Sequence, residues 1–113
     1  MTITRLLAQM TVSDLPAAER WYGRLFGTGP DARPMDGLLE WHLSPAFGVQ
    51  VYVEPDRAGR SSMVLGVDDV TAEAGRLTAA AIDHDGAQDA TTVRILPLTD
   101  ADGNRIVFTS PLR

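Results

Sequence analysis

The hydrophobic pattern of the first half of the chain predicts one strand, one helix and two further strands. Between Asp14 and Gly27, apolar residues recur at the spacing of one helical face. Asp14 is a good N-cap, Pro16 lies in the first turn, and Gly27 follows the last turn, as is typical of the two ends of a helix. The predicted strands cover residues 6–12, 38–43 and 49–53, with a turn at 44–48.

The second half of the chain predicts the same order of elements. Asp69 caps a second helix, whose apolar stripe runs through Val70, Ala74, Leu77 and Ala81. The expected strands cover residues 63–67, 93–98 and 105–109, with a further short strand at 87–90 and a turn at 100–104.

A duplication explains this repeated order. Val12-Ser13-Asp14-Leu15 recurs as Val67-Asp68-Asp69-Val70 at an offset of 55, and residues 48–55 match residues 104–111 at an offset of 56. The chain therefore consists of two modules, 1–56 and 57–113, joined near Asp56–Arg60 and forming one domain. The helices cover only one face of the predicted sheet, so the other face needs a second cover or encloses a cavity.

Composition excludes several classes of chemistry. The chain of 113 residues has no cysteine, ten basic residues that are all arginine, and two histidines. Thiolate zinc sites, Schiff-base lysines and three-histidine metal sites within one chain are therefore excluded. A net charge of -5 argues against nucleic acid as a partner, and no apolar run is long enough to span a membrane. With no signal peptide recognised, we expect a cytoplasmic protein.

The duplicated signature and the closing strand resemble the vicinal oxygen chelate superfamily, which includes glyoxalase I, bleomycin-resistance proteins and extradiol dioxygenases. The most specific piece is 99–106, Thr-Asp-Ala-Asp-Gly-Asn-Arg-Ile, where the family usually has Pro in place of Ala101. The similarity covers essentially the whole chain. It implies an α+β fold of paired βαβββ modules, whose mixed sheet curls around a ligand cleft with the helices on the outer face. It also implies a homodimer, the commonest closed assembly.

The same resemblance implies four positions where metalloenzymes of the superfamily hold a divalent ion. Here these positions contain Leu7, Val51, Ser62 and Val107. Such an ion needs carboxylate oxygen or imidazole nitrogen, which these side chains do not supply. We therefore expect no metal and no other cofactor.

The sequence leaves one strand register open. In one register Val51 faces the cleft. In the other, Val49, Val51 and Val53 pack under the helix, and Gln50 and Tyr52 face the cleft. Burying the Gln50 side chain under the helix without a hydrogen-bond partner would cost free energy, whereas the three valines form a uniformly apolar set.

The candidate cleft combines a mostly apolar surface with a few polar groups, which is typical of sites for organic ligands. Trp41 is either a core residue or a platform for a flat ligand, and His42 is either an acid or base of the pocket or a surface histidine. The complete candidate set is Leu7, Gln9, Thr11, Trp41, His42, Gln50, Tyr52, Ser62, Val64 and Val107. No catalytic residue is assigned.

Three functions remain open at this point. The first is a metal-free protein that sequesters a small molecule, such as an antibiotic or another aromatic metabolite. The second is a lyase, isomerase or dioxygenase-like enzyme with a rearranged or metal-free site, in which His42 or Glu40 acts as a base. The third is a module with a vestigial cleft that binds a protein partner.

Overall fold

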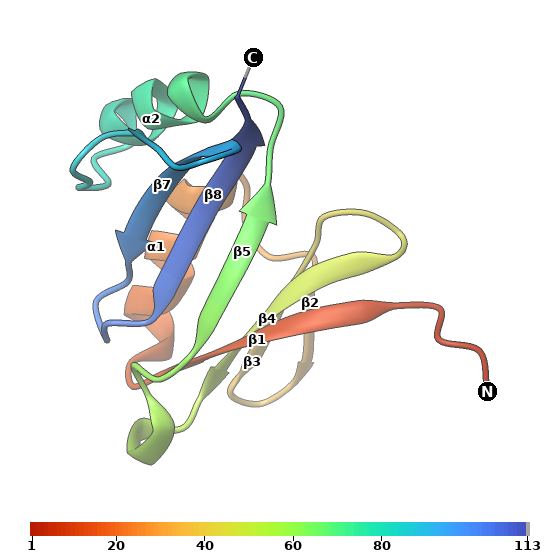
Figure 1. Ribbon diagram of the computed structural model, residues 1–113. Coiled ribbons are helices and arrows are strands. Elements are labelled where there is room, and N and C mark those ends of the chain that lie inside the picture. The colour runs from red at the N-terminus through yellow and green to blue at the C-terminus, as the bar shows by residue number, and fades with distance from the viewer. Residues whose placement is uncertain (113) are drawn as a thin grey trace.

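The two halves of the chain fold into the same βαβββ unit in the computed structural model, which describes residues 1–112 (Figure 1). The first unit contains β1 (Leu6–Val12), α1 (Leu15–Phe26), β2 (Ala32–Met35), β3 (Leu38–His42) and β4 (Phe47–Val53). A short 3-10 helix, η1 (Pro55–Arg57), leads to the second unit. That unit contains β5 (Ser62–Gly66), α2 (Val70–Ala79), β6 (Gln88–Asp89), β7 (Val93–Thr99) and β8 (Arg105–Pro111).

Each unit forms a four-stranded sheet of mixed direction. The strand orders are β1-β4-β3-β2 and β5-β8-β7-β6, and in both sheets the first and last strands of the unit pair in parallel. The expected α+β class and the paired βαβββ modules are confirmed. The mixed sheet is divided into two open sheets, and no strand of one pairs with a strand of the other within residues 1–112.

The helices form where the capping residues predict them. The Asp14 carboxylate accepts a hydrogen bond from the Ala17 N–H, and Gly27 ends α1 with a positive φ of 76°. The Asp69 carboxylate accepts hydrogen bonds from the first N–H groups of α2. Within residues 1–112, no helix is long and apolar enough to cross a bilayer.

One hydrophobic cluster receives side chains from both units. Met10, Val51 and Leu39 line the helix-covered face of the first sheet, and Ile106 and Phe108 do the same in the second. Tyr22 and Leu25 of α1, together with Leu77 of α2, fill the space above these strands. The helices therefore cover one face of each sheet and leave the other face free.

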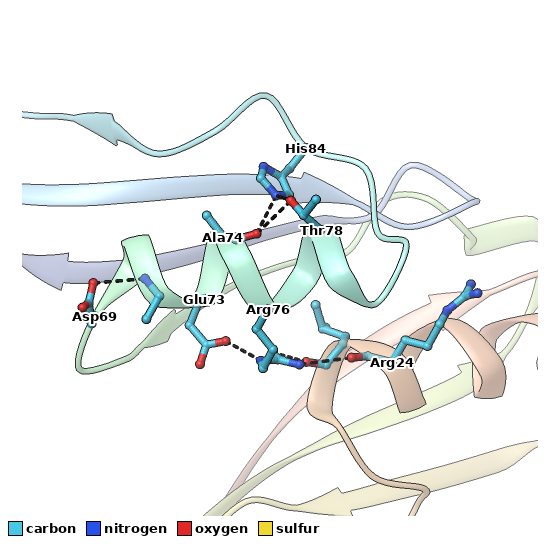
Figure 2. Close-up of polar contacts among 9 residues, drawn as sticks. Arg24, Asp69, Glu73, Ala74, Arg76, Thr78 and His84 are labelled. Atoms are coloured by element: carbon cyan, nitrogen blue, oxygen red, sulfur yellow. Dashed lines mark hydrogen bonds and ion pairs between the residues drawn. The ribbon is translucent and has the colours of Figure 1, made fainter.

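A charged contact also ties the two helices together (Figure 2). The Arg76 guanidinium of α2 donates to the carbonyl oxygens of Arg24 and Leu25 at the end of α1, at 3.2 and 2.6 Å. Glu73 accepts from Arg76 Nε at 2.7 Å and so holds this side chain in place. A cation at the C-terminus of a helix satisfies free carbonyl groups and is favoured by the helix dipole.

A buried polar network joins the loop before β8 to the first unit. The Asn104 side-chain amide donates to the Thr11 carbonyl oxygen and to Asp100, both at 2.7 Å, and its oxygen accepts from the Ser61 N–H at 2.9 Å. Tyr22 Oη donates to the same Asp100 carboxylate at 2.7 Å. Burial, together with this carboxylate, raises the pKa of the Tyr22 phenol far above its ordinary value, so the phenol remains a donor.

Replacing Asn104 tests how far the two units depend on this network. Asn104→Ala is expected to lower the free energy of unfolding by about 3 kcal/mol, because several buried groups lose their partners at once. Urea unfolding followed by circular dichroism measures this change. Asp89→Ala, which breaks the exposed ion pair with Arg94, is the control and should change stability little. Equal effects of the two substitutions would contradict a structural role for the network.

Candidate functional site

The pairing of β4 with its neighbours settles which side of the strand faces the helices. Val49 and Val51 are fully buried in the core beneath the helices. Since strand side chains alternate, Gln50 and Tyr52 lie on the helix-free face. Gln50 is opposite Gln9 of β1 on one side and opposite Glu40 of β3 on the other.

The strand registers correct one of the four positions implied by the family resemblance. In the first unit Gln9 pairs with Gln50, and in the second Val64 pairs with Val107. The first strands of the units are thus related by an offset of 55 and the last strands by 57. The structural counterpart of Val107 is Gln50 rather than Val51, because the match that aligned the ends of these strands was one residue out of register.

Trp41 does not lie in the candidate cleft. Its side chain is fully buried on the helix-covered face, where its ring centroid is 5.6 Å from that of Phe26 and 6.2 Å from that of Tyr22. Trp41 Nε1 donates to the carbonyl oxygen of Thr28 at 2.8 Å. Of its two predicted roles, the structure shows the core residue, because β3 must bury its apolar face against α1.

The other candidate residues share the helix-free faces of the two sheets. Leu7, Gln9 and Thr11 of β1 lie beside Gln50 and Tyr52 of β4. His42 belongs to the same face of the first sheet, and Ser62, Val64 and Val107 lie on the corresponding face of the second. Gly48 stands opposite both Leu7 and His42, and a Cβ there would collide with the Trp41 carbonyl oxygen. Gly48 therefore cannot carry a side chain here, and the Leu7 side chain lies against this position.

The strands β1 and β5 diverge from each other (Figure 1). A groove of about 530 Å³ lies between the two units and is lined by residues of both strands. Its inner wall is apolar and includes Leu25 and Phe108. Its rim carries Leu6, Phe47 and Val64, whose side chains are all strongly exposed. Of these three, Val64 was a predicted cleft residue. Leu7, Gln9 and Gln50 do not line the groove. On the predicted cleft face Gln9 is exposed, whereas Thr11 and Val107 are already buried within the single chain.

A chain of hydrogen bonds crosses the helix-free face of the first sheet. Glu40 accepts from His42 Nε2 at 2.8 Å and from Gln50 Nε2 at 2.6 Å. Gln50 Oε1 in turn accepts from Gln9 Nε2 at 3.2 Å. The hydrogen bonds from His42 and Gln50 hold the pKa of Glu40 below its ordinary value of 4.5, with a smaller contribution from the positive charge of Arg5.

Sequence reasoning named Glu40 only as an alternative base and omitted it from the cleft. The signal was present in the alternation of β3, because a buried Trp41 places Glu40 and His42 together on the opposite face.

The donor set does not fit the divalent ion that the superfamily resemblance implies. The corrected positions offer Leu7, Gln50, Ser62 and Val107, among which a single amide is the best oxygen donor. Among the residues that the structure describes, no three histidine, aspartate or glutamate side chains are close enough together to hold a metal ion. Glu40 and His42 are hydrogen-bonded directly to each other.

The lowered pKa of Glu40 predicts a specific dependence of stability on pH. A carboxylate whose pKa is lower in the folded state stabilises the fold above its unfolded pKa, near 4.5, and loses this contribution as the pH falls through the folded pKa. The difference in unfolding free energy between wild type and Glu40→Gln should therefore be largest at neutral pH and shrink below about pH 4.5. Urea titrations between pH 7 and pH 3 measure it. A difference that stays constant over this range would contradict the prediction.

Comparisons with known proteins place this geometry in context. No family model and no curated protein sequence matches the chain. The fold is similar to a glyoxalase/bleomycin resistance protein from Catenulispora acidiphila DSM 44928, with a TM-score of 0.88, 27% identity, and coverage of 96% of this chain and 98% of that chain. It is also similar to TnmS3, an antibiotic binding protein from Streptomyces sp. CB03234, with a TM-score of 0.78, 24% identity and 99% of both chains covered.

A glyoxalase/bleomycin resistance protein/dioxygenase from Nocardioides is similar as well, with a TM-score of 0.74 and 19% identity. That match covers 100% of this chain and 85% of the other. The similarities extend over nearly the whole chain and therefore include both βαβββ units.

Proposed function

Because the chain belongs by its fold to the vicinal oxygen chelate superfamily, we propose that it is a metal-free protein that binds and sequesters a small organic molecule. The observation that carries the proposal is the donor set of the helix-free face. Leu7, Gln50, Ser62 and Val107 occupy the positions where the resemblance, with the strand registers, implies the superfamily's metal ligands. We propose an antibiotic or another aromatic metabolite as the ligand, and the similar protein TnmS3, an antibiotic binding protein, supports the first of these. A cytoplasmic location is part of the same proposal.

The proposed binding surface has the composition of a site for organic ligands. Leu7 and Tyr52 supply apolar surface, and Gln9, Gln50 and Ser62 supply polar groups that would orient a guest. Trp41, which lies in the core, has no part in this surface.

We place the second subunit of a homodimer on the groove between β1 and β5. Leu6 is 71% exposed, Val64 67% and Phe47 51%, although all three are large apolar side chains on one rim. Clustered apolar exposure of this kind is typical of an interaction surface. Both β1 and β5 are edge strands of their sheets, so a second copy also covers two unpaired edges. The cleft face would then be completed by residues of the second subunit.

One observation favours an enzyme as the alternative. The Glu40 carboxylate is bonded to His42 Nε2, and His42 is partly exposed, which is how a general base is oriented in many active sites. Stoichiometric binding with the ligand recovered unchanged supports sequestration, whereas conversion of the ligand that is lost in His42→Gln supports the enzyme.

The metal-free proposal predicts the elemental content of the purified protein. After dialysis, mass spectrometry of the elements should find far less than one Zn, Ni, Fe or Mn per chain, because the metal positions lack suitable ligands. About one equivalent of any of these metals, lost on replacing a residue of the helix-free face, would refute the proposal.

Ligand binding on the helix-free face predicts a change in thermal stability. A true ligand at a hundred times its dissociation constant stabilises the fold by about 2.7 kcal/mol, which raises Tm by about ten degrees for a domain of this size. A thermal-shift screen of aromatic and peptide-like natural products measures this. Leu7→Asp should abolish the shift, because it places an unpaired charge on the binding face.

The neighbouring residue provides the matched control. Leu6 lies on the same strand but on the groove between β1 and β5, so Leu6→Asp should dissociate the dimer, whereas Leu7→Asp should leave it intact. Light scattering gives the mass of each variant. A wild-type mass of one chain at micromolar concentration would contradict the dimer, and ligand shifts that survive both Leu7→Asp and Val107→Asp would contradict the cleft assignment.

A further inference from the structure

The hydrogen bonds around Glu40 have a fixed direction. Glu40 lies in the middle of β3, between β2 and β4, and only 8% of its side chain is exposed. Its carboxylate is ionised at neutral pH, because His42 and Gln50 hold the pKa below its ordinary value. An ionised carboxylate only accepts hydrogen bonds, so both neighbours must donate to it.

This requirement determines which atoms of His42, Gln50 and Gln9 donate hydrogen bonds and which accept them. His42 carries its proton on Nε2, which donates to Glu40, and in the neutral ring Nδ1 is therefore an acceptor. Gln50 turns its NH2 toward Glu40, so its oxygen accepts from the NH2 of Gln9. Gln9 is then left with its carbonyl oxygen as an acceptor and with the second hydrogen of its NH2 group. We call the hydrogen-bonded series His42–Glu40–Gln50–Gln9 the relay. Each end of the relay thus presents an accepting atom to the surface.

The negative charge of Glu40 also acts against an anionic ligand group at the ends of these hydrogen bonds. Arg5 contributes positive charge near Glu40, but among the residues that the structure describes it forms no ion pair with this carboxylate. The direct partners of Glu40 are a neutral amide and an imidazole. A ligand group that brings a donor hydrogen is therefore favoured at the ends of the relay, and a carboxylate is disfavoured.

We propose that Glu40 is a positioning residue which makes the face around Gln9 and His42 an array of acceptors, and that the site selects aromatic ligands carrying hydrogen-bond donors, such as phenols. This proposal rests on the proposed ligand-binding function. A purely structural role of the network, in which it only holds β3 against β4, predicts no preference among ligands that share a ring system.

Glu40→Gln distinguishes these roles because a neutral amide has one accepting and one donating end. With Gln at this position, either His42 or Gln50 must reverse its hydrogen bond, and the relay no longer ends in two acceptors. Glu54→Gln is the matched control. It makes the same exchange just after β4, where the glutamate's ion-pair partner is Arg57 rather than a member of the relay.

The test uses three probes with one ring system: 2-naphthol, which donates a hydrogen bond, 2-methoxynaphthalene, which does not, and 2-naphthoate, which is an anion. Fluorescence titration at pH 7.5 should show wild type and Glu54→Gln binding 2-naphthol about fivefold to tenfold more tightly than 2-methoxynaphthalene, and 2-naphthoate most weakly. In Glu40→Gln the preference for 2-naphthol should fall to about twofold or less. Nitrogen NMR should show the Nε2–H tautomer of His42 in wild type, with His84→Gln used to assign the signals.

The outcomes separate this proposal from the function on which it rests. Equal affinities for the three probes, or an Nδ1–H tautomer of His42 in wild type, overturn the acceptor array and leave ligand binding in place. An unchanged preference in Glu40→Gln overturns the role of Glu40. Failure of all three probes to bind at millimolar concentration counts against an aromatic ligand site on this face, and against the array with it.

Discussion

The buried amide of Asn104 connects three parts of the chain that are distant in sequence. It binds the backbone of Thr11 at the end of β1, the backbone of Ser61 before β5, and the Asp100 carboxylate, which also accepts from Tyr22 of α1. Thr11, Asp100 and Asn104 are buried, so breaking one of their contacts leaves a buried polar group without a partner. The two units are therefore held in one relative position by directional bonds, in addition to the apolar cluster they share.

That fixed position determines which residues meet on the helix-free faces. Parallel pairing of β1 with β4 sets Gln9 beside Gln50, and antiparallel pairing of β3 with β4 sets Glu40 on the other side of Gln50. A shift of any of these strands by one residue would exchange the polar row for Met10, Val51 and the other core residues. The need to keep these apolar residues in the core therefore maintains the strand register that aligns Gln9, Gln50 and Glu40.

The sequence predicted the elements with strong local signals. Asp14 and Asp69 marked the starts of both helices, and alternating apolar runs located most of the strands. β2 was missed because Ala32–Met35 contains Arg and Pro and is largely exposed, so it lacks an apolar pattern. Gln50 and Trp41 depended on pairing between distant strands, which a local pattern does not fix. One internal match placed Val51 where the strand registers place Gln50.

The polar chemistry of the first sheet depends on the amide of Gln50. An amide at position 50 is a weak ligand for a divalent ion, and on a sheet surface its NH2 needs an acceptor. Glu40 supplies that acceptor from the next strand, and His42 satisfies the other oxygen of the carboxylate. The cost of covering a negative charge is thus offset by two hydrogen bonds instead of by a cation. The sheet thus sets the direction of these hydrogen bonds, and the same contacts that satisfy Glu40 leave the accepting atoms of Gln9 and His42 at its surface.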